Sequence, residues 1–216
     1  KKNNKIISMS SKDLLENVKK LRELTGVGFK DCKLAIDENN GDLEKSVEFL
    51  RKKGIAKASK KMSRTASEGL CLVKESGGEI SLIEINCETD FVAKNKDFLE
   101  FCKEISEINF NQKSDITKIN VSKTKNNSSV ESALTDLIAK MGEKITLRRS
   151  VFFNKENSKN YFYIHNSVEK NMGKIVSIVK LSNSNDDLGK KIAMHISALS
   201  PLSIDKESIK KEIIDK

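Results

Sequence analysis

An apolar strand meets a helical pattern in Glu84-Ile-Asn-Cys-Glu-Thr89-Asp90-Phe91-Val92-Ala93-Lys94-Asn95. Thr89 is a natural N-cap, because its hydroxyl can accept a hydrogen bond from a free backbone N–H two or three residues later. Asp90, in the first turn, favours the positive end of the helix dipole. We therefore predict that one long helix begins after Thr89, and that Asp90 and Phe91 act from a fixed corner.

Phe91 itself has two interpretations. It lies seven residues before Phe98, the first member of an apolar stripe at helical spacing. It could therefore extend that stripe into the core, where most aromatic side chains lie. Alternatively, the first turn overhangs the sheet and presents Phe91 to a partner. Periodicity alone leaves both open. The stripe comprises Phe98, Phe101, Cys102, Ile105 and Ile108.

Composition indicates one sizeable domain with a smaller one and a heavily charged surface. The 216 residues are 37% hydrophobic and 33% charged, and the net charge is +9. Such a charge favours an acidic protein surface or nucleic acid as the partner. The four cysteines show no C-x-x-C spacing and only two histidines occur, which argues against a zinc site. We predict free thiols, a reducing compartment and no membrane span.

The first 54 residues predict a three-helix bundle of the ubiquitin-associated type. Ser10 and Asp13 suggest a capping box before the first helical pattern, which Gly26-Val27-Gly28 ends. A second pattern stops at Asn39-Asn40-Gly41, and Asp42 caps a third that runs to Gly54.

Residues 51–64 contain seven cations and no acid. We interpret residues 55–66 as a solvated, basic helical linker, since charge runs are usually solvated. A nucleic-acid-binding stripe is the alternative, which the lack of interleaved aromatic residues weakens.

From residue 67 the sequence predicts an α+β core with antiparallel sheets and flanking helices. Gly77-Gly78 joins two strands with an apolar period of two, which is typical of a tight hairpin. In that register Leu70 faces Ile85, Leu72 faces Ile83 and Cys71 faces Glu84. We expect a long surface connection at 111–128, a helix from Ser129 to Gly142 and a strand at 144–153. Residues 67–150 form the first half of the predicted core.

Residues 151–216 predict a second half-domain. Strands at 161–165 and from Gly173 precede a helix that begins at Asp186 or Asp187, so the arrangement at 70–108 recurs at 161–199. A charged helical pattern follows from Asp205 and stops without a C-cap. We therefore expect this second half to be incomplete.

Catalytic signatures are absent from the sequence: it has no G-x-x-x-x-G-K-[ST], G-x-S-x-G or H-E-x-x-H. His165 lies on a predicted strand, where a structural role is commoner than catalysis. We predict a binding protein with no catalytic residue, no metal site and no cofactor.

With these elements in place, the chain resembles the elongation factor Ts family. The resemblance covers nearly all of 12–205, and its Thr-Asp-Phe-Val motif is highly specific. Four stretches carry it in order, namely Val18-Lys-Lys-Leu-Arg-Glu-Leu-Thr-Gly-Val-Gly-Phe-Lys-Asp-Cys-Lys33, Ala66-Ser-Glu-Gly69, Asn86-Cys-Glu-Thr-Asp-Phe-Val-Ala-Lys94 and Ile192-Ala-Met-His-Ile196.

This resemblance implies a guanine-nucleotide exchange factor that binds elongation factor Tu and is not an enzyme. In the family, an Asp-Phe pair enters the partner beside its magnesium ion and nucleotide phosphates. On matching positions Thr89, Asp90, Phe91 and Val92 form that element, with Phe91 exposed as a wedge.

Four further residues match partner contacts of the family: Phe29 and Lys33 in the bundle, Gly142, and His165. Phe29 stands where many relatives have methionine. The resemblance implies no direct nucleic acid or membrane contact, and a cytoplasm of bacterial type or, alternatively, an organellar matrix. Monomer and dimer both remain open. An RNA-binding protein and a ubiquitin-associated adaptor are the alternative functions.

Overall fold

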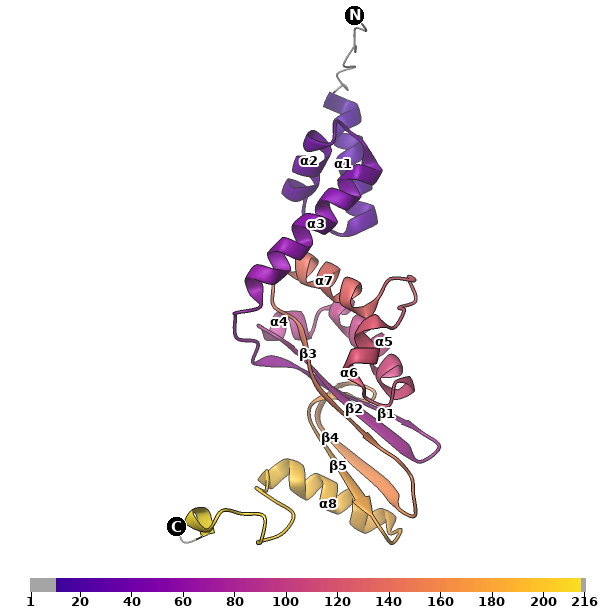
Figure 1. Cartoon of the computed structure of the whole chain (residues 1–216), viewed down its shortest axis with the longest axis vertical. Helices are drawn as coiled ribbons and strands as arrows, with labels where there is room; N and C mark the ends of the chain where they lie inside the picture. The colour runs from indigo at the N-terminus through magenta and orange to yellow at the C-terminus, as the bar shows by residue number, and fades with distance from the viewer. Residues whose placement is uncertain (1–10, 215–216) are drawn as a thin grey trace, which may run out of the picture.

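The computed structural model describes residues 11–214 of the chain (Figure 1). It is a mixed α+β fold, as predicted. The elements are α1 (Ser11–Thr25), α2 (Phe29–Glu38), α3 (Leu43–Lys61), β1 (Glu68–Ser76), β2 (Glu79–Cys87), α4 (Asp90–Ala93), α5 (Lys96–Asn111), α6 (Ile116–Val121), α7 (Val130–Met141), β3 (Thr146–Phe153), β4 (Lys159–Glu169), β5 (Met172–Leu181), α8 (Asp186–Leu199) and α9 (Lys211–Ile214).

Helices α1, α2 and α3 pack around a small core of their own at one end of the elongated molecule (Figure 1). The Asp42 side chain caps α3 by accepting from the Lys45 N–H at 3.0 Å, as its position predicted. The three predicted helices are confirmed, whereas their likeness to ubiquitin-associated domains stays a prediction. Ser10 of the expected capping box lies outside the described residues. The buried core consists of Val18, Leu21, Cys32, Ala35, Ile36 and Leu50.

Helix α3 continues through Gly54 to Lys61, so the predicted linker is helical as expected up to Lys61, but the expected break at Gly54 is absent. Glycine in a helix interior costs about 1 kcal/mol relative to alanine. Here the missing side chain allows α3 to pack closely on α7, because a Cβ at Gly54 would lie 3.1 Å from the Ala139 Cβ. Ala58, one turn later, is buried in the core of the sheet domain. Close packing on α7 therefore offsets the propensity cost.

One five-stranded antiparallel sheet replaces the several sheets that were expected, with the order β3-β2-β1-β5-β4. The predicted hairpin register is confirmed: Leu70 lies opposite Ile85, and Leu72 opposite Ile83. The second hairpin, β4–β5, joins the first through a short pairing of β1 with β5 at Cys71↔Gly173 and Leu72↔Met172.

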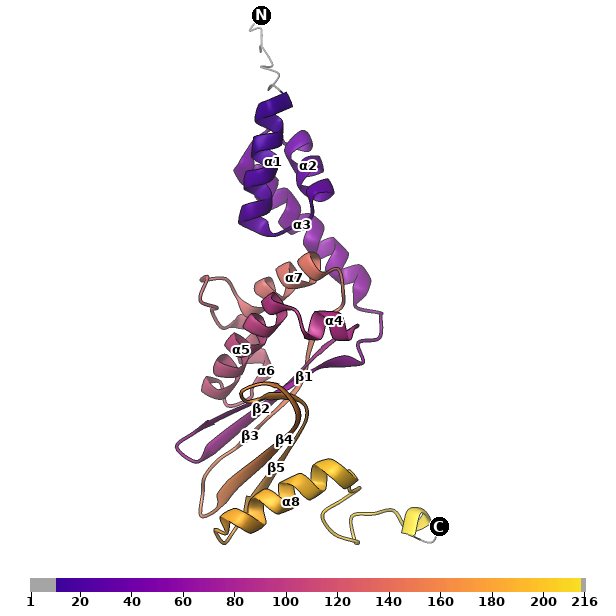
Figure 2. The same ribbon diagram turned by 180° about the vertical axis from the view of Figure 1, so that it is seen from behind.

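Helices α5 and α4 cover one face of the first hairpin, and α7 packs against α5 (Figure 2). The prediction of one long helix after Thr89 is wrong. The chain forms the single turn α4 and then starts again, because the Asn95 side chain accepts the Asp97 N–H at 2.9 Å and caps a new helix. The stripe of α5 is buried as predicted, with Phe98, Cys102 and Ile105 fully enclosed.

Residues 111–128 contain a helix that was not predicted. Asp115 caps α6 through the Lys118 N–H at 3.1 Å, and Ile119 is buried in the core. The short helix thus uses the isolated apolar residue of a stretch that was expected to be a surface connection.

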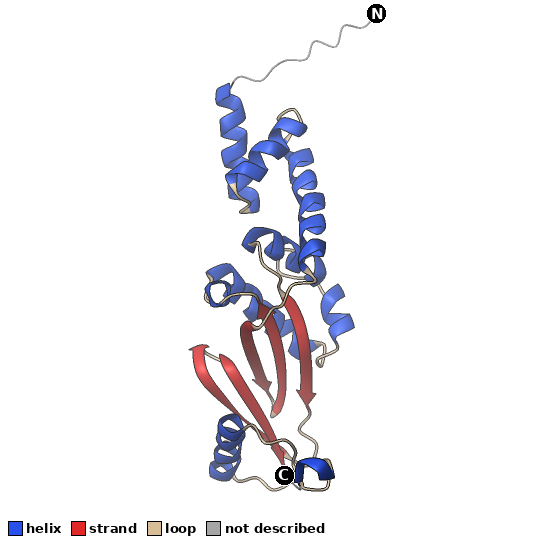
Figure 3. Ribbon diagram, turned by 90° about the vertical axis from the view of Figure 1, so that its left-hand side faces the viewer, coloured by secondary structure: helices blue, strands red, loops and turns tan. Residues whose placement is uncertain are grey.

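In the second half, α8 packs on the β4–β5 hairpin, so that the sequence of hairpin and helix recurs (Figure 3). The Asn185 side chain caps α8 at the Leu188 N–H. The helix expected from Asp205 is shorter than predicted. Asp205 instead accepts from the Ser208 N–H and hydroxyl in a turn, and only Lys211–Ile214 is helical.

Candidate functional site

The corner between β2 and α5 is held from inside by two small apolar side chains. Thr89 adopts an extended conformation and its hydroxyl accepts the Val92 N–H at 3.4 Å, so it caps α4 as predicted. Val92 and Ala93, on the inner side of this single turn, are buried in the core of the sheet domain. The turn α4 is therefore anchored to the sheet although it is too short to be stable alone.

Phe91 points away from this anchor. Its side chain is 82% exposed, compared with 45% for Phe29, the next most exposed phenylalanine of the described residues. The core interpretation of Phe91 is therefore wrong and its predicted exposure is confirmed, whereas its contact with a partner stays a prediction. An aromatic ring left in water gains nothing for the fold, whereas exposed aromatic side chains are typical anchors of protein interfaces.

Asp90 lies next to Phe91 on the same exposed turn. Lys94 Nζ contacts Asp90 Oδ2 at 2.7 Å, and both side chains are largely open to solvent. This hydrogen bond and its charge lower the pKa of Asp90, with a smaller contribution from Lys174 of β5. Asp90 therefore carries a full negative charge at neutral pH. Since an exposed ion pair contributes little, this carboxylate can exchange Lys94 for another cation.

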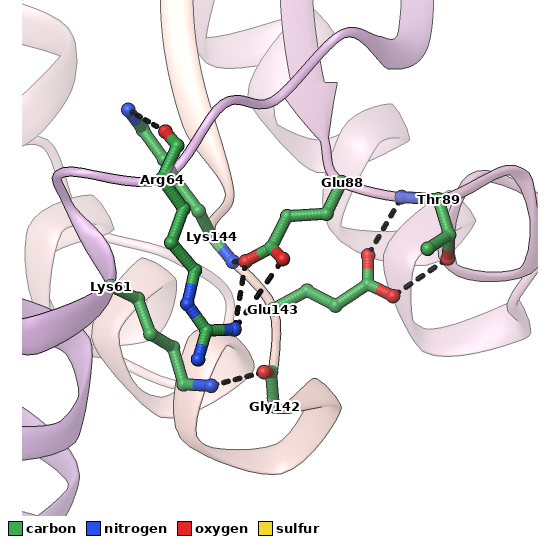
Figure 4. A network of polar contacts seen from close by, with 7 residues as sticks. All are labelled: Lys61, Arg64, Glu88, Thr89, Gly142, Glu143 and Lys144. Carbon is green, nitrogen blue, oxygen red and sulfur yellow. Dashed lines mark hydrogen bonds and ion pairs between the residues drawn. The ribbon is translucent and has the colours of Figure 1, made fainter.

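The corner is fixed from outside by a network of polar contacts with the α7–β3 connection (Figure 4). The Thr89 hydroxyl donates to Glu143 Oε1 at 2.6 Å, and its backbone N–H donates to Oε2 at 3.0 Å. Glu88 Oε1 in turn accepts the Lys144 N–H at 2.6 Å. Gly142 ends α7 in the left-handed conformation that favours glycine, with φ of 76°, as predicted for a C-cap. The candidate residue Gly142 is therefore brought beside the Thr89 corner.

The same network reaches the end of α3 and the connection to β1. Arg64 Nη1 lies 3.4 Å from both carboxylate oxygens of Glu88, and Lys144 Nζ donates to the carbonyl oxygens of Met62 and Arg64 at 2.7 and 2.9 Å. Lys61 donates to the Gly142 carbonyl oxygen. Contacts from the N-terminal part of the chain therefore end beside Thr89 (Figure 4).

A buried thiol completes the inner side of the corner. Cys87 Sγ lies 3.2 Å from the Thr89 carbonyl oxygen. Burial raises the pKa of Cys87 to about 12, so that the thiol stays protonated and donates this hydrogen bond. All four cysteines are free in the structure.

The remaining candidate residues lie elsewhere on the molecule. Phe29 and Lys33 are exposed and, four residues apart, share one face of α2 in the bundle. His165 is exposed on β4, with Nδ1 3.4 Å from the Tyr163 hydroxyl. The structure therefore forms three separate surfaces from these residues: the Thr89 corner with Gly142, the α2 face and β4.

Several cations of residues 51–64 bind protein groups. Lys52 pairs with Glu48 at 2.8 Å, Lys53 pairs with Asp31 at 3.0 Å, and Arg51 donates to the Ser132 hydroxyl at 3.0 Å. Lys61 and Arg64 belong to the network of Figure 4. These contacts favour a structural role for the basic run over a nucleic-acid-binding stripe.

Sequence reasoning missed Glu88, Glu143 and Lys144. Glu88 lies inside one of the four stretches that resemble the family, and Glu143 follows the matching residue Gly142, but each binds backbone groups of a segment more than fifty residues away. A carboxylate that binds distant backbone N–H groups leaves no periodic pattern. Only the strand before Thr89 and the helix end at Gly142 indicated that these segments terminate, and neither indicated that the two ends meet.

Residues 11–214 contain neither a membrane-spanning helix nor a metal-binding cluster. No helix in this range is long and apolar enough to cross a membrane. No group of three or more His, Cys, Asp and Glu side chains within it could hold a metal ion.

Comparisons with known proteins agree with the resemblance seen in the motifs. Residues 88–216 match the family described as Elongation factor TS. Elongation factor Ts of Maricaulis maris is 42% identical over 207 residues, which cover 92% of this chain and 66% of the relative. That of Xanthobacter autotrophicus is 43% identical over 203 residues, covering 91% and 66%. That of Azorhizobium caulinodans is 43% identical over 198 residues, covering 89% and 64%. The chain thus spans about two thirds of the length of these curated relatives.

Proposed function

The chain belongs to the elongation factor Ts family, and we propose that it is a guanine-nucleotide exchange factor for elongation factor Tu. In this role it binds elongation factor Tu carrying GDP, disturbs the magnesium and phosphate site of that partner and promotes GDP release during translation elongation. It makes and breaks no covalent bond, and it needs no cofactor of its own.

The exposure of Phe91 on a fixed turn carries this proposal. An 82% exposed aromatic side chain stands on a backbone whose neighbours Val92 and Ala93 are buried. Pre-organisation of this kind reduces the entropy that binding costs, because the turn need not be ordered when the partner arrives. Phe91 is therefore suited to enter an apolar crevice of the partner as a wedge.

Asp90 supplies the charge beside that wedge. Its carboxylate is ionised at neutral pH and pairs with the exposed Lys94. Carboxylate oxygens compete with water and phosphate for hard cations and for the groups that bind them. An Asp90 carboxylate brought near the partner's magnesium ion would weaken the contacts that hold ion and nucleotide together.

The energetic requirement is modest. A thousandfold faster GDP release corresponds to about 4 kcal/mol off the dissociation barrier. One buried interface aromatic and the loss of a few magnesium contacts are of that size. By linkage, GDP and the factor weaken each other's binding equally, so the factor binds the nucleotide-free partner best. The cellular excess of GTP over GDP then sets the direction of exchange.

The separate surfaces extend the contact. Phe29 and Lys33 on α2 are suited to grip a helix of the partner's nucleotide-binding domain, while Gly142 lies beside the corner that carries the wedge. His165 on β4 forms a further contact of the same partner. This function involves no direct nucleic-acid or membrane contact, and it places the protein in a bacterial cytoplasm or an organellar matrix.

Release of a fluorescent GDP analogue from elongation factor Tu tests the proposal. The complex is mixed with the chain and excess unlabelled GDP, and the fluorescence decay is followed at increasing concentrations of the chain. We expect the release rate to rise to a plateau far above the spontaneous rate. The acceleration should shrink when EDTA has already removed the magnesium ion. Release that stays at the spontaneous rate would contradict the proposed function.

A further inference from the structure

Glu88 and Glu143 form a reciprocal clamp between two segments that are distant in sequence. The carboxylate of Glu143 binds the backbone N–H and hydroxyl of Thr89, the residue after Glu88. The carboxylate of Glu88 binds the backbone N–H of Lys144, the residue after Glu143. Each acid thus binds the backbone that follows the other, and the two segments cannot slide past one another without breaking both sets of bonds (Figure 4).

The position of Phe91 depends on this clamp. Helix α4 is a single turn of four residues, so its own hydrogen bonds do not define its orientation. Burial of Val92 fixes the inner side, but apolar contacts are non-directional and allow the turn to rotate. The two bonds from Glu143 to Thr89 are directional and involve a charge, which makes them stronger than neutral hydrogen bonds. They therefore set the angle at which α4 leaves the sheet.

The clamp also receives contacts from the end of α3. Arg64 approaches the Glu88 carboxylate, and Lys61 binds the Gly142 carbonyl oxygen next to Glu143. Lys144, whose backbone N–H Glu88 binds, holds the carbonyl oxygens of Met62 and Arg64 with its side chain. Since α3 belongs to the N-terminal bundle as well, these contacts join the bundle to the same carboxylates.

We propose that Glu143 is a positioning residue for nucleotide exchange, which holds the Asp90–Phe91 turn at the angle needed to enter the partner, and that the contacts of Lys61, Arg64 and Lys144 couple the N-terminal bundle to that angle. This inference rests on the proposed function. Glu143 acts through Thr89 and need not touch the partner or its nucleotide.

Glu143→Gln and Glu143→Asp test the role of Glu143. Glu143→Gln removes the charge from both contacts with Thr89, and its NH2 group can only donate to the hydroxyl that donates to Glu143 in the wild type. Glu143→Asp keeps the charge but is one methylene shorter. Glu107→Gln is the matched control, because it removes the charge of a Glu whose carboxylate pairs with Lys74 at 2.8 Å, away from the corner. Each variant is measured for thermal unfolding, amide hydrogen exchange at Thr89 and GDP-analogue release.

We expect both Glu143 variants to exchange the Thr89 amide proton at least about tenfold faster than wild type. The maximal rate of GDP release should fall by about tenfold, since small displacements of a positioned group have effects of this order or larger. The concentration of factor that gives half the maximal rate should change little, because the surface of α2 is untouched. Glu107→Gln should match wild type in all three measurements.

Three outcomes would overturn the inference. A wild-type Thr89 amide proton that exchanges as fast as in Glu143→Gln would show that the clamp is not formed. A Glu143→Asp variant with wild-type release would show that charge alone matters and that geometry does not. A lower melting temperature, together with a release rate that returns to the wild-type value once it is expressed per folded molecule, would reduce Glu143 to a stabilising residue. Failure of the wild-type chain itself to release GDP would instead refute the proposed function, and the amide exchange at Thr89 would still report separately on the clamp.

Arg64→Gln tests the coupling between the N-terminal bundle and the clamp. Arg64→Gln keeps much of the side chain's length but removes the charge that approaches Glu88. We expect it to lower the maximal release rate in the same direction as Glu143→Gln, by about threefold, as suits an exposed contact. A wild-type maximal rate in Arg64→Gln would contradict the coupling.

Discussion

Phe91 and Phe98 are seven residues apart, yet Phe91 is 82% exposed and Phe98 is fully buried. They lie in separate helices, because α4 ends at its C-cap Lys94 and the Asn95 side chain caps the start of α5. The same residue type therefore stabilises the fold at one position and is free for a partner at the other. We therefore expect mutation of Phe98 to lower stability and mutation of Phe91 to slow nucleotide exchange.

Phe98→Ala should destabilise the protein strongly. The side chain lies in the main core between α5 and the sheet, and truncation of a packed phenylalanine costs about 3–5 kcal/mol. Urea unfolding, followed by circular dichroism, measures the change in the free energy of unfolding. Phe101→Leu in the same helix is a milder control, since it keeps most of the apolar volume. An effect of Phe98→Ala below about 1 kcal/mol would contradict its place in the core.

Gly69→Ala should also destabilise the protein, for a steric reason. Gly69 has a φ of 134°, and an added Cβ would lie 2.2 Å from the Ile85 carbonyl oxygen on the paired strand. Relief requires movement of β1 or β2, so we expect a loss of about 3 kcal/mol in the free energy of unfolding.

Gly77→Ala is the matched control for Gly69→Ala. Its φ is also positive, at 61°, but no atom lies within 4 Å of the added Cβ. Only the backbone strain of about 1–2 kcal/mol applies there. Urea unfolding of both variants separates the steric cost from the backbone strain. Equal losses in the free energy of unfolding would show that the approach of Gly69 to β2 is not tight.

The loss of stability at acidic pH should depend on Glu88. The Lys144 backbone N–H, and secondarily Arg64, lower the pKa of Glu88 below its ordinary value of 4.5. A carboxylate with a lowered folded-state pKa stabilises the fold above its unfolded pKa, and this stabilisation is lost as the pH falls through the folded-state value. Glu88→Gln should therefore lower the melting temperature at neutral pH, and the difference from wild type should shrink below a pH of about 4.5. A difference that stays constant down to a pH of about 3 would contradict the ionised clamp.

The α2 surface should govern affinity rather than the maximal rate. Phe29→Ala and Lys33→Ala remove exposed side chains far from the Thr89 corner along the molecule (Figure 1). We expect each to raise the concentration of factor needed for half-maximal GDP release by about tenfold, as for an interface anchor. Lys30→Ala, on an exposed position of the same helix, should have little effect. A lower plateau with unchanged half-saturation would contradict the separation of roles.

Much of the fold followed from local patterns. The Gly77-Gly78 turn with flanking residues of period two predicted the hairpin and its register correctly, because a two-residue loop permits only one pairing. The caps at Thr89, Asp42 and Ser129 and the stop at Gly142 were also predicted from short-range chemistry. The membership of the elongation factor Ts family, predicted from four collinear motifs, is confirmed by the family match and the relatives.

What could not be predicted depends on tertiary contacts. Gly54 read as a helix end, yet close packing on Ala139 carries α3 past it. Asn95 read as part of a continuing helix, yet its side chain starts a new one. The clamp of Glu88 and Glu143 joins two chain ends that only the folded sheet brings together. At Gly54 and in the clamp, the contact that decides the structure is remote in sequence. At Asn95, a local cap competes with a helical pattern of similar strength.

The central claim is tested most directly by the Phe91→Ala variant, for which both the stimulated GDP release and the thermal unfolding are measured. Val121→Ala is the control, because it truncates another exposed apolar side chain, on α6. If Phe91 is the wedge, the variant should melt almost as the wild type does, while its maximal rate of GDP release from elongation factor Tu falls by about tenfold or more. Val121→Ala should change neither quantity. A folded Phe91→Ala protein that releases GDP at the wild-type rate would contradict the account.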